Sequence, residues 1–224
     1  MADKAAFEIP YSQFEYRVNL TKPMINLVGK FQDVVLPFVD ALAPFGFSFE
    51  DTEFQLSAAK PKDHVIIFQQ PAHSPPPQMR VALKWSNMTV TVDQPVWESP
   101  EVMMSLCKAA NKALWEIGRV PMASQQISAG LHVQPKVVPR SALTSGFLTP
   151  KVHELLDGKI IGQGVILHRE NASIVIDDSA GFANALFIRI QRIFDGAKTI
   201  DEITSVLIDD TIKVWEVVGF EGEL

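Results

Sequence analysis

The stretch VALKWSNMTVTV, Val81–Val92, constrains the fold more than any other part of the chain. Large apolar side chains alternate with small or polar ones on both sides of Ser86 and Asn87, which suit a two-residue turn. With that turn, Trp85 faces Met88, and the large apolar side chains share one side of the hairpin. A slip of one residue would expose all of them to water. The sequence therefore predicts an antiparallel hairpin with one buried face.

Helical periodicity appears in three places along the chain. One pattern covers residues 24–46, with a kink or a break expected at Pro37, whose ring opposes a continuous helix. A second covers residues 99–118 and begins after a predicted N-cap at Ser99. The third covers residues 200–218. In each pattern apolar residues recur every three or four positions, which is typical of a helix that packs one face on a core.

The third helical pattern begins with Thr199 and Glu202, the spacing of a capping box that satisfies backbone N–H groups of the first turn. Each helical pattern accompanies a strand-rich segment. This organisation predicts the α+β class, with antiparallel sheets and amphipathic helices packed on one face. The same order also fits repeated strand-helix-strand units of the ferredoxin-like kind.

Prolines, serines and threonines interrupt the periodic pattern between residues 137 and 151, which is typical of a connection. We therefore expect a first α+β domain over residues 1–138. A second α+β unit, a hairpin plus the last helix, is expected over residues 139–224. The alternative is that both halves pack as one continuous domain. The proline-rich stretch 71–78 lies between two strand-like segments, and we interpret it as an exposed loop within the first domain.

The charge balance bears on the choice of partner. The chain has 20 basic and 26 acidic side chains, a formal net charge of -6, and no run of Lys and Arg. A protein that binds nucleic acid needs clustered Lys and Arg to displace counterions from phosphates. We therefore expect no nucleic-acid partner.

Apolar runs, the first residues and the cysteine content indicate the cellular compartment of the protein and bear on its cofactors. The chain has no apolar run of about 18 residues, the length needed to span a membrane, and its first residues lack the pattern of a secretory signal. Its single cysteine, Cys107, cannot form an internal disulfide. These features predict a soluble cytoplasmic protein that does not interact with a membrane, and no motif implies a cofactor.

The hairpin near the end of the chain carries the densest set of polar candidates. Alternation places His168, Glu170, Ser173 and Asp177 on one face of residues 167–178. An imidazole and carboxylates on one face could hold a divalent cation or act as acid and base. The simpler interpretation is a sheet face that is polar because it is solvated. His132 and Trp85 are further candidates for lining a pocket between sheet and helices.

Two other features of the sequence do not meet the requirements of a metal site or of a catalytic cysteine. His153–Asp157 reads HELLD and has an aspartate where a zinc-protease helix needs its second histidine. Cys107 lies on the predicted apolar face of its helix, where a buried thiol is inert. We therefore predict no metal site and no catalytic cysteine.

The order of elements resembles that of a sporadically distributed family of uncharacterised bacterial proteins. The resemblance rests on the strand pair 79–95, the helix that follows, the strand ISAGLHVQP and the final helix after IVIDD. His132 stands where the pattern of that family favours arginine. The resemblance implies no activity.

The function expected from the sequence is that of a non-enzymatic binding or assembly module that self-associates, with an unknown protein or small molecule as a further partner. The reason is that no nucleophile, metal or phosphate motif meets its geometric requirements, while sheet edges are available for pairing. The alternative is a small-molecule-binding protein or an enzyme with a pocket between sheet and helices.

Overall fold

The computed structural model describes the chain over residues 5–25, 27, 30–57, 60–97, 99–136, 165–169, 171–218 and 220–221. Contacts divide the chain into two compact units. The hairpin unit consists of Gln13–Ile127 and Ile193–Thr204, and the terminal unit consists of Met1–Ser12, Ser128–Arg192 and Ser205–Leu224. The domain boundary expected between residues 138 and 139 falls outside the described residues and stays a prediction.

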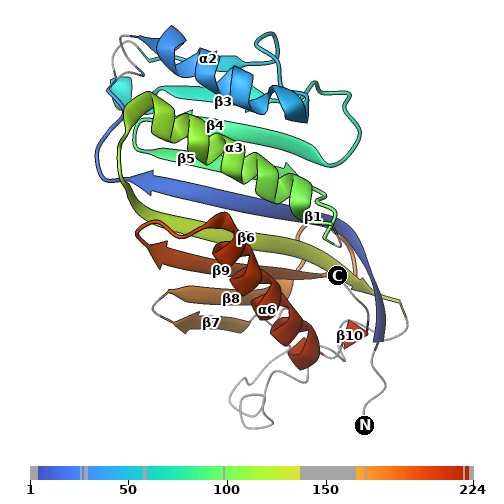
Figure 1. Ribbon diagram of the computed structural model, residues 1–224. Coiled ribbons are helices and arrows are strands. Elements are labelled where there is room, and N and C mark those ends of the chain that lie inside the picture. The colour runs from blue at the N-terminus through green and yellow to red at the C-terminus, as the bar shows by residue number, and fades with distance from the viewer. Residues whose placement is uncertain are drawn as a thin grey trace. The chain divides into compact units, whose positions relative to one another are not determined.

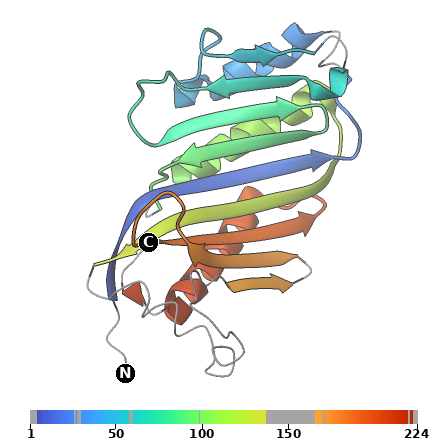
Figure 2. The ribbon, with the colours of Figure 1, turned by 180° about the vertical axis from the view of Figure 1, so that it is seen from behind.

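The hairpin unit is an open antiparallel sheet with helices on one face. Its strand order is β2 (Glu53–Gln55), β3 (Val65–Gln69), β4 (Gln78–Lys84), β5 (Asn87–Asp93), then the part of β1 (Ala5–Leu20) from Gln13 on and the part of β6 (Met122–Pro135) up to Ile127. The helices α2 (Phe31–Leu42) and α3 (Glu101–Gly118) pack together and cover one face of this sheet (Figure 1). Figure 2 shows the opposite face, which no described helix covers. This is the predicted α+β architecture.

The predicted hairpin is present as β4 and β5, with one correction. Leu83 pairs with Met88 rather than with Val90, so the turn consists of Trp85 and Ser86. Because the register differs by two residues, the same side chains remain on the buried face. The buried apolar residues of the hairpin are Met79, Val81, Leu83, Met88, Val90 and Val92, and Thr89 and Thr91 on the other face of β5 are buried as well.

Hydrogen bonds from another part of the chain hold this turn. The Trp85 carbonyl accepts the backbone N–H of Met24 at 2.8 Å, and the Ser86 carbonyl accepts that of Leu20 at 2.9 Å. The alternation within the hairpin contains no information about these bonds. Trp85 was expected on the core face and is instead half-buried in the turn.

The helix predictions need two corrections and have one confirmation. The helix α2 continues through Pro37, so the break that was one of the two expectations there is wrong; burial of Val34 and Phe38 on either side offsets the lost backbone hydrogen bond. The N-cap of α3 is Pro100, with no side-chain cap, so the cap predicted at Ser99 is wrong. The capping box of the last helix is confirmed, with Thr199 N donating to Glu202 Oε2 at 2.9 Å and Glu202 N donating to Thr199 Oγ1 at 3.2 Å.

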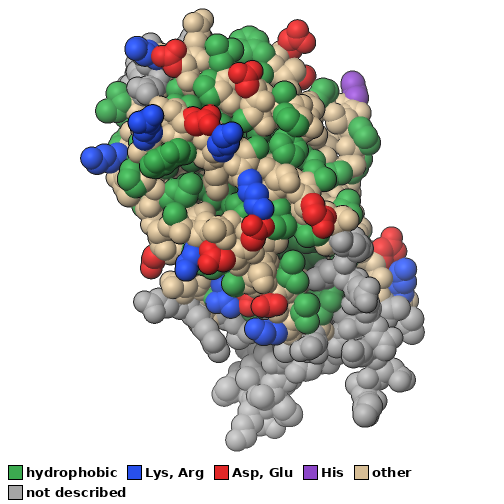
Figure 3. Space-filling view, in the orientation of Figure 1, with side chains coloured by type: hydrophobic (Ala, Val, Ile, Leu, Met, Phe, Trp, Pro, Cys, Tyr) green, Lys and Arg blue, Asp and Glu red, His purple; other side chains and the backbone are tan. Residues whose placement is uncertain are grey.

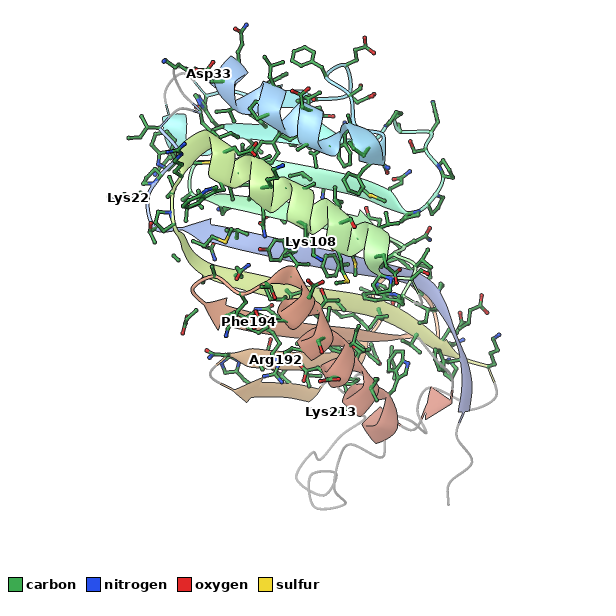
Figure 4. All side chains as sticks on the ribbon, in the orientation of Figure 1. Lys22, Asp33, Lys108, Arg192, Phe194 and Lys213 are labelled. Carbon is green, nitrogen blue, oxygen red and sulfur yellow. The ribbon has the colours of Figure 1, made fainter. Side chains whose placement is uncertain are left out.

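The terminal unit is also an antiparallel sheet with a helix on one face. Its strand order is β1, β6, β9 (Leu186–Asp195), β8 (Ala172–Asp178) and β7 (Val165–Arg169), and β10 (Phe220–Glu221) pairs with β1 in parallel. The helix α6 (Ile200–Val218) covers one face (Figure 1). Ile188 and Ile190 of β9 are buried on that face together with Trp215 of α6, which contacts Phe7 at 5.3 Å between ring centroids. Figure 4 labels Arg192, the residue of β9 that pairs with α6.

Candidate functional site

The proline-rich stretch is an ordered loop, residues 70–77, that joins β3 and β4, which are antiparallel neighbours as predicted. The side chain of Gln70 holds the base of the loop. Its Nε2 donates to the Phe45 carbonyl at 2.8 Å, and its Oε1 accepts the Met79 backbone N–H at 2.9 Å. A turn within the loop is closed by the Ser74 N–H, which donates to the Pro71 carbonyl at 2.9 Å. The loop therefore has a defined shape and can form the wall of a site.

An apolar pocket of about 210 Å³ lies between this loop and the start of α3. It is lined by Pro77, Met79, Val92, Pro95, Val96, Ser99, Val102 and Met103. Val96 and Val102 are 50% and 52% exposed, whereas Met79, Val92 and Met103 are buried. Ser99 is the one polar side chain of the lining. An apolar group can therefore enter without leaving a buried polar atom unpaired.

A polar pocket of about 250 Å³ lies on the other side of the same loop. It is lined by Gln69, Gln70, Ala72, Gln78, Met79, Arg80 and Asp93. Arg80 and Gln78 alternate with the buried residues of β4, so they lie on the sheet face opposite to α2 and α3. Met79 belongs to the lining of both pockets.

Charges on the helix-covered face do not gather by sign. Figure 3 shows Lys and Arg side chains interspersed with Asp and Glu, and hydrophobic side chains reach the surface between them. This view contains no patch of a single charge to attract a polyanion. Recognition at the apolar pocket therefore depends on shape and apolar contact more than on charge.

His132 lies on β6 in the terminal unit, among aromatic side chains. Its ring centroid is 5.0 Å from that of Phe182, 5.1 Å from that of Phe187 and 5.7 Å from that of Tyr11. Burial lowers the pKa of His132 below its ordinary value of 6.5. The imidazole is therefore neutral over a wider pH range than a free histidine.

The contact between His132 and Ser179 has the spacing of a nucleophile and its base. Nδ1 of His132 lies 2.7 Å from Oγ of Ser179. Ser179 Oγ also accepts the backbone N–H groups of Gly181 at 3.2 Å and Phe182 at 2.9 Å. These bonds occupy both lone pairs of the oxygen, and no carboxylate of a described residue contacts the imidazole. The hydroxyl therefore fixes the turn after β8 rather than acting as an activated nucleophile.

The polar residues of the β7–β8 hairpin do not form one site. His168 pairs with Ser173, so Asp177 lies four residues further along β8, at about 13 Å from the rise of roughly 3.3 Å per residue. His168 and Asp177 are both exposed, and Glu170 lies outside the described residues. At that separation one ion cannot bridge His168 and Asp177, and their face is best explained as solvated.

A buried polar network in the hairpin unit surrounds Tyr16. The Tyr16 hydroxyl accepts Asn111 Nδ2 at 2.8 Å and Gln125 Nε2 at 2.7 Å, and Gln125 Oε1 accepts the Lys198 backbone N–H at 2.5 Å. Burial raises the pKa of Tyr16 to about 12. The phenol is therefore protonated at neutral pH, and the network ties β1, α3 and β6 together rather than transferring protons.

Metal and thiol chemistry find little support among the described residues. No group of three His, Cys, Asp or Glu in those ranges is placed to hold a metal ion. His153 and Asp157 lie outside them. Cys107 is buried, and burial raises the pKa of its thiol above the ordinary value, so the thiolate needed for reaction is disfavoured. No described helix is both long enough and apolar enough to cross a membrane.

The two pockets were not predicted from the sequence. Met79 and Val92 look like ordinary core positions of a hairpin, and Arg80 looks like an ordinary exposed position. The signal that the sequence does contain is a pair of proline-containing connections, residues 70–77 before the hairpin and 94–100 after it, which antiparallel pairing brings to the same end.

The resemblance in element order stays a prediction. No protein-family model matches the chain, and neither does any curated protein or solved structure.

Proposed function

We propose that this chain is a non-enzymatic binding module whose apolar pocket receives one large apolar side chain of a protein partner. The observation that carries the proposal is the composition of the pocket, where buried Met79 and Met103 form the interior and half-exposed Val96 and Val102 form the rim. Apolar anchors that enter such pockets supply most of the binding energy at protein interfaces.

The size of the pocket supports a side chain as the occupant. A volume of about 210 Å³ is below the roughly 300–1,000 Å³ of pockets that hold drug-sized ligands. An apolar cavity of roughly 150 Å³ can hold benzene, so one aliphatic or aromatic side chain fits. Burial of such a side chain contributes about 1.5–3 kcal/mol, and contacts with the apolar rim add to it.

Charge favours a basic partner segment. Glu101 directly precedes Val102 of the rim, and the whole chain has a net charge of -6. Charge complementarity speeds encounter with a partner and selects among partners. We therefore infer a partner segment with a single large apolar residue next to Lys or Arg.

Selection from a library of random peptides against the full chain tests this function. Selected sequences should share one large apolar residue with an adjacent basic residue. Titration calorimetry with synthetic peptides should show at least about tenfold weaker binding to Val102→Glu, because a carboxylate at the rim must be desolvated.

The matched control is Leu36→Glu, which places the same charge at a helix position that is 56% exposed and outside the pocket. Peptide affinity should stay within about twofold of the unmodified chain in this variant. Equal loss of affinity in both variants, or selected peptides without an apolar anchor, would remove the basis for the proposal.

We further propose that the chain self-associates through β7. Among the described strands β7 ends the order of the terminal unit, and its Ile166 is 72% exposed. An exposed apolar edge strand favours pairing with a strand of a second copy. Light scattering after size exclusion should show a dimer that Ile166→Lys converts to monomer and Leu36→Lys does not. A monomer at high concentration would contradict this part.

A further inference from the structure

We propose that the polar pocket beside the β3–β4 loop binds a small zwitterionic molecule of the amino-acid class. The Arg80 guanidinium of the pocket would bind the carboxylate of the ligand, and the Asp93 carboxylate of the pocket would bind the ammonium of the ligand. The site is separate from the apolar pocket in every polar group it uses, so it does not depend on a protein partner binding there.

Strand register gathers the polar groups on one side of the sheet. Gln69 of β3 pairs directly with Arg80 of β4. Asp93 of β5 pairs with Gln78 of β4 on one side and with Gln13 of β1 on the other. Directly opposed residues in antiparallel strands share a face. Arg80, Asp93 and three glutamine amides are therefore held within two adjacent rows of the sheet. Glu15 lies in the row of Arg80, beyond Thr91, and the Gln69 amide donates to Glu53 Oε1 at 2.8 Å.

The loop closes one side of this array. Both polar atoms of the Gln70 amide are engaged, Nε2 with the Phe45 carbonyl and Oε1 with the Met79 N–H. Gln70 is therefore a fixed wall and not a ligand group. Gln78 Nε2 makes only a long hydrogen bond of 3.4 Å to the Ser74 carbonyl, so its amide can turn to a bound molecule at little cost.

Arg80 is the cation of the pocket. It forms no ion pair or hydrogen bond with a described residue, although Asp93 lines the same pocket. A guanidinium presents five N–H donors in a planar fork that matches a carboxylate in a two-point contact. The donor set of Arg80 is therefore available to the carboxylate of a ligand.

Asp93 selects for a ligand that is not a simple anion. Its Oδ1 accepts Gln13 Nε2 at 2.8 Å, and the carboxylate carries the negative charge of the pocket lining. A doubly charged anion such as phosphate would be repelled by this carboxylate at short range. A ligand ammonium would instead be attracted, which favours a zwitterion over an anion.

The volume sets the size of the ligand. About 250 Å³ is below the roughly 300–1,000 Å³ range of pockets for drug-sized molecules. A free amino acid fits within it.

The experiment is a titration of the full chain with each standard amino acid, followed by calorimetry and by ligand-observed magnetic resonance. The best ligand should then be compared with its N-acetyl and its carboxamide derivatives. Each derivative loses one charge and should bind at least about tenfold more weakly, since a charge-assisted hydrogen bond is lost in each case.

Two substitutions on β4 test the location. Arg80→Gln should abolish measurable binding. Lys84→Gln removes the same charge from the same face of the same strand, outside the pocket, and should leave the affinity within about twofold. Val102→Glu should also leave it unchanged, which separates this site from the apolar pocket.

Three results would overturn the proposal. One is the absence of saturable binding by any standard amino acid at millimolar concentration. Another is an equal loss of affinity in Arg80→Gln and Lys84→Gln, which would show general attraction to the surface. The third is competition by inorganic phosphate at equal concentration, which would identify a simple anion site.

Discussion

Arg192 of β9 and Asp210 of α6 form a two-point ion pair within the terminal unit. Arg192 Nη2 donates to Asp210 Oδ1 at 2.7 Å, and Nε donates to Oδ2. The Asp210 side chain is 8% exposed and that of Arg192 is 32% exposed. The pair fixes α6 on the sheet, and a carboxylate buried to this degree depends on its partner.

Removal of either partner should destabilise the chain. Arg192→Met leaves the Asp210 carboxylate buried without its cation, so we expect the free energy of unfolding to fall by about 2–3 kcal/mol. The exposed pair between Lys108 and Asp201, with 50% and 62% exposed side chains, provides the control. Asp201→Asn should cost less than about 1 kcal/mol in the same urea titration. Equal costs would mean that Arg192 contributes only as a surface residue.

The Tyr16 phenol should lose its proton at a higher pH than an exposed tyrosine does. Its hydroxyl should also stabilise the folded chain. Because the pKa of Tyr16 is raised to about 12 from 10.0, the unfolded chain loses this proton first, and stability falls as pH rises from 10 towards 12. Phenolate absorbance should show a delayed step that is absent from Tyr16→Phe and present in Tyr11→Phe. Tyr16→Phe should also cost about 1–3 kcal/mol at neutral pH, because the amides of Asn111 and Gln125 lose their acceptor.

His132 should make stability depend on pH in the acidic range. Burial lowers its pKa, so below 6.5 the unfolded chain binds this proton more readily than the folded chain, and stability decreases as pH falls. His132→Phe keeps the ring and should lose this dependence relative to the unmodified chain. Ser179→Ala removes the hydrogen bond and should keep it, since burial is the cause. Parallel pH profiles of the unmodified chain and His132→Phe would contradict the assignment.

The Gln70 side chain should contribute more to the stability of the chain than the exposed side chain of Gln78 does. Gln70→Ala leaves the Met79 N–H and the Phe45 carbonyl without their partner, and we expect a loss of about 1–3 kcal/mol. Gln78→Ala removes a 3.4 Å bond at an exposed position and should change stability by less than about 0.5 kcal/mol. Thermal unfolding of both variants checks the difference. A similar small change in stability in both variants would show that the hydrogen bonds of the Gln70 side chain do not stabilise the loop.

Much of the fold could be predicted because local patterns determine it. Alternation identified the buried face of β4 and β5, and Thr199 with Glu202 marked the start of α6. The exact register could not be predicted, because Met24 and Leu20 hold the turn from a distant part of the chain. Likewise Pro37 lies inside a helix because tertiary burial outweighs its local preference.

The candidate sites were harder to predict, and the reason is the same. His132 was singled out as a residue type, but its contacts with Ser179 and Phe182 depend on how β6 lies beside the turn after β8. Arg80 and Asp93 come together only through the pairing of three strands. A single sequence does not specify that pairing before the turn positions are known.

Met79 contributes to both pockets, with its side chain in the core and its backbone N–H bonded to Gln70. A molecule that displaces Met79 on entering one pocket must change the walls of the other. Thermodynamic linkage then requires the effect to be mutual, so that each occupant alters the affinity for the other by the same factor. A single methionine at the end of one strand would in that case couple a protein partner to the concentration of a small molecule.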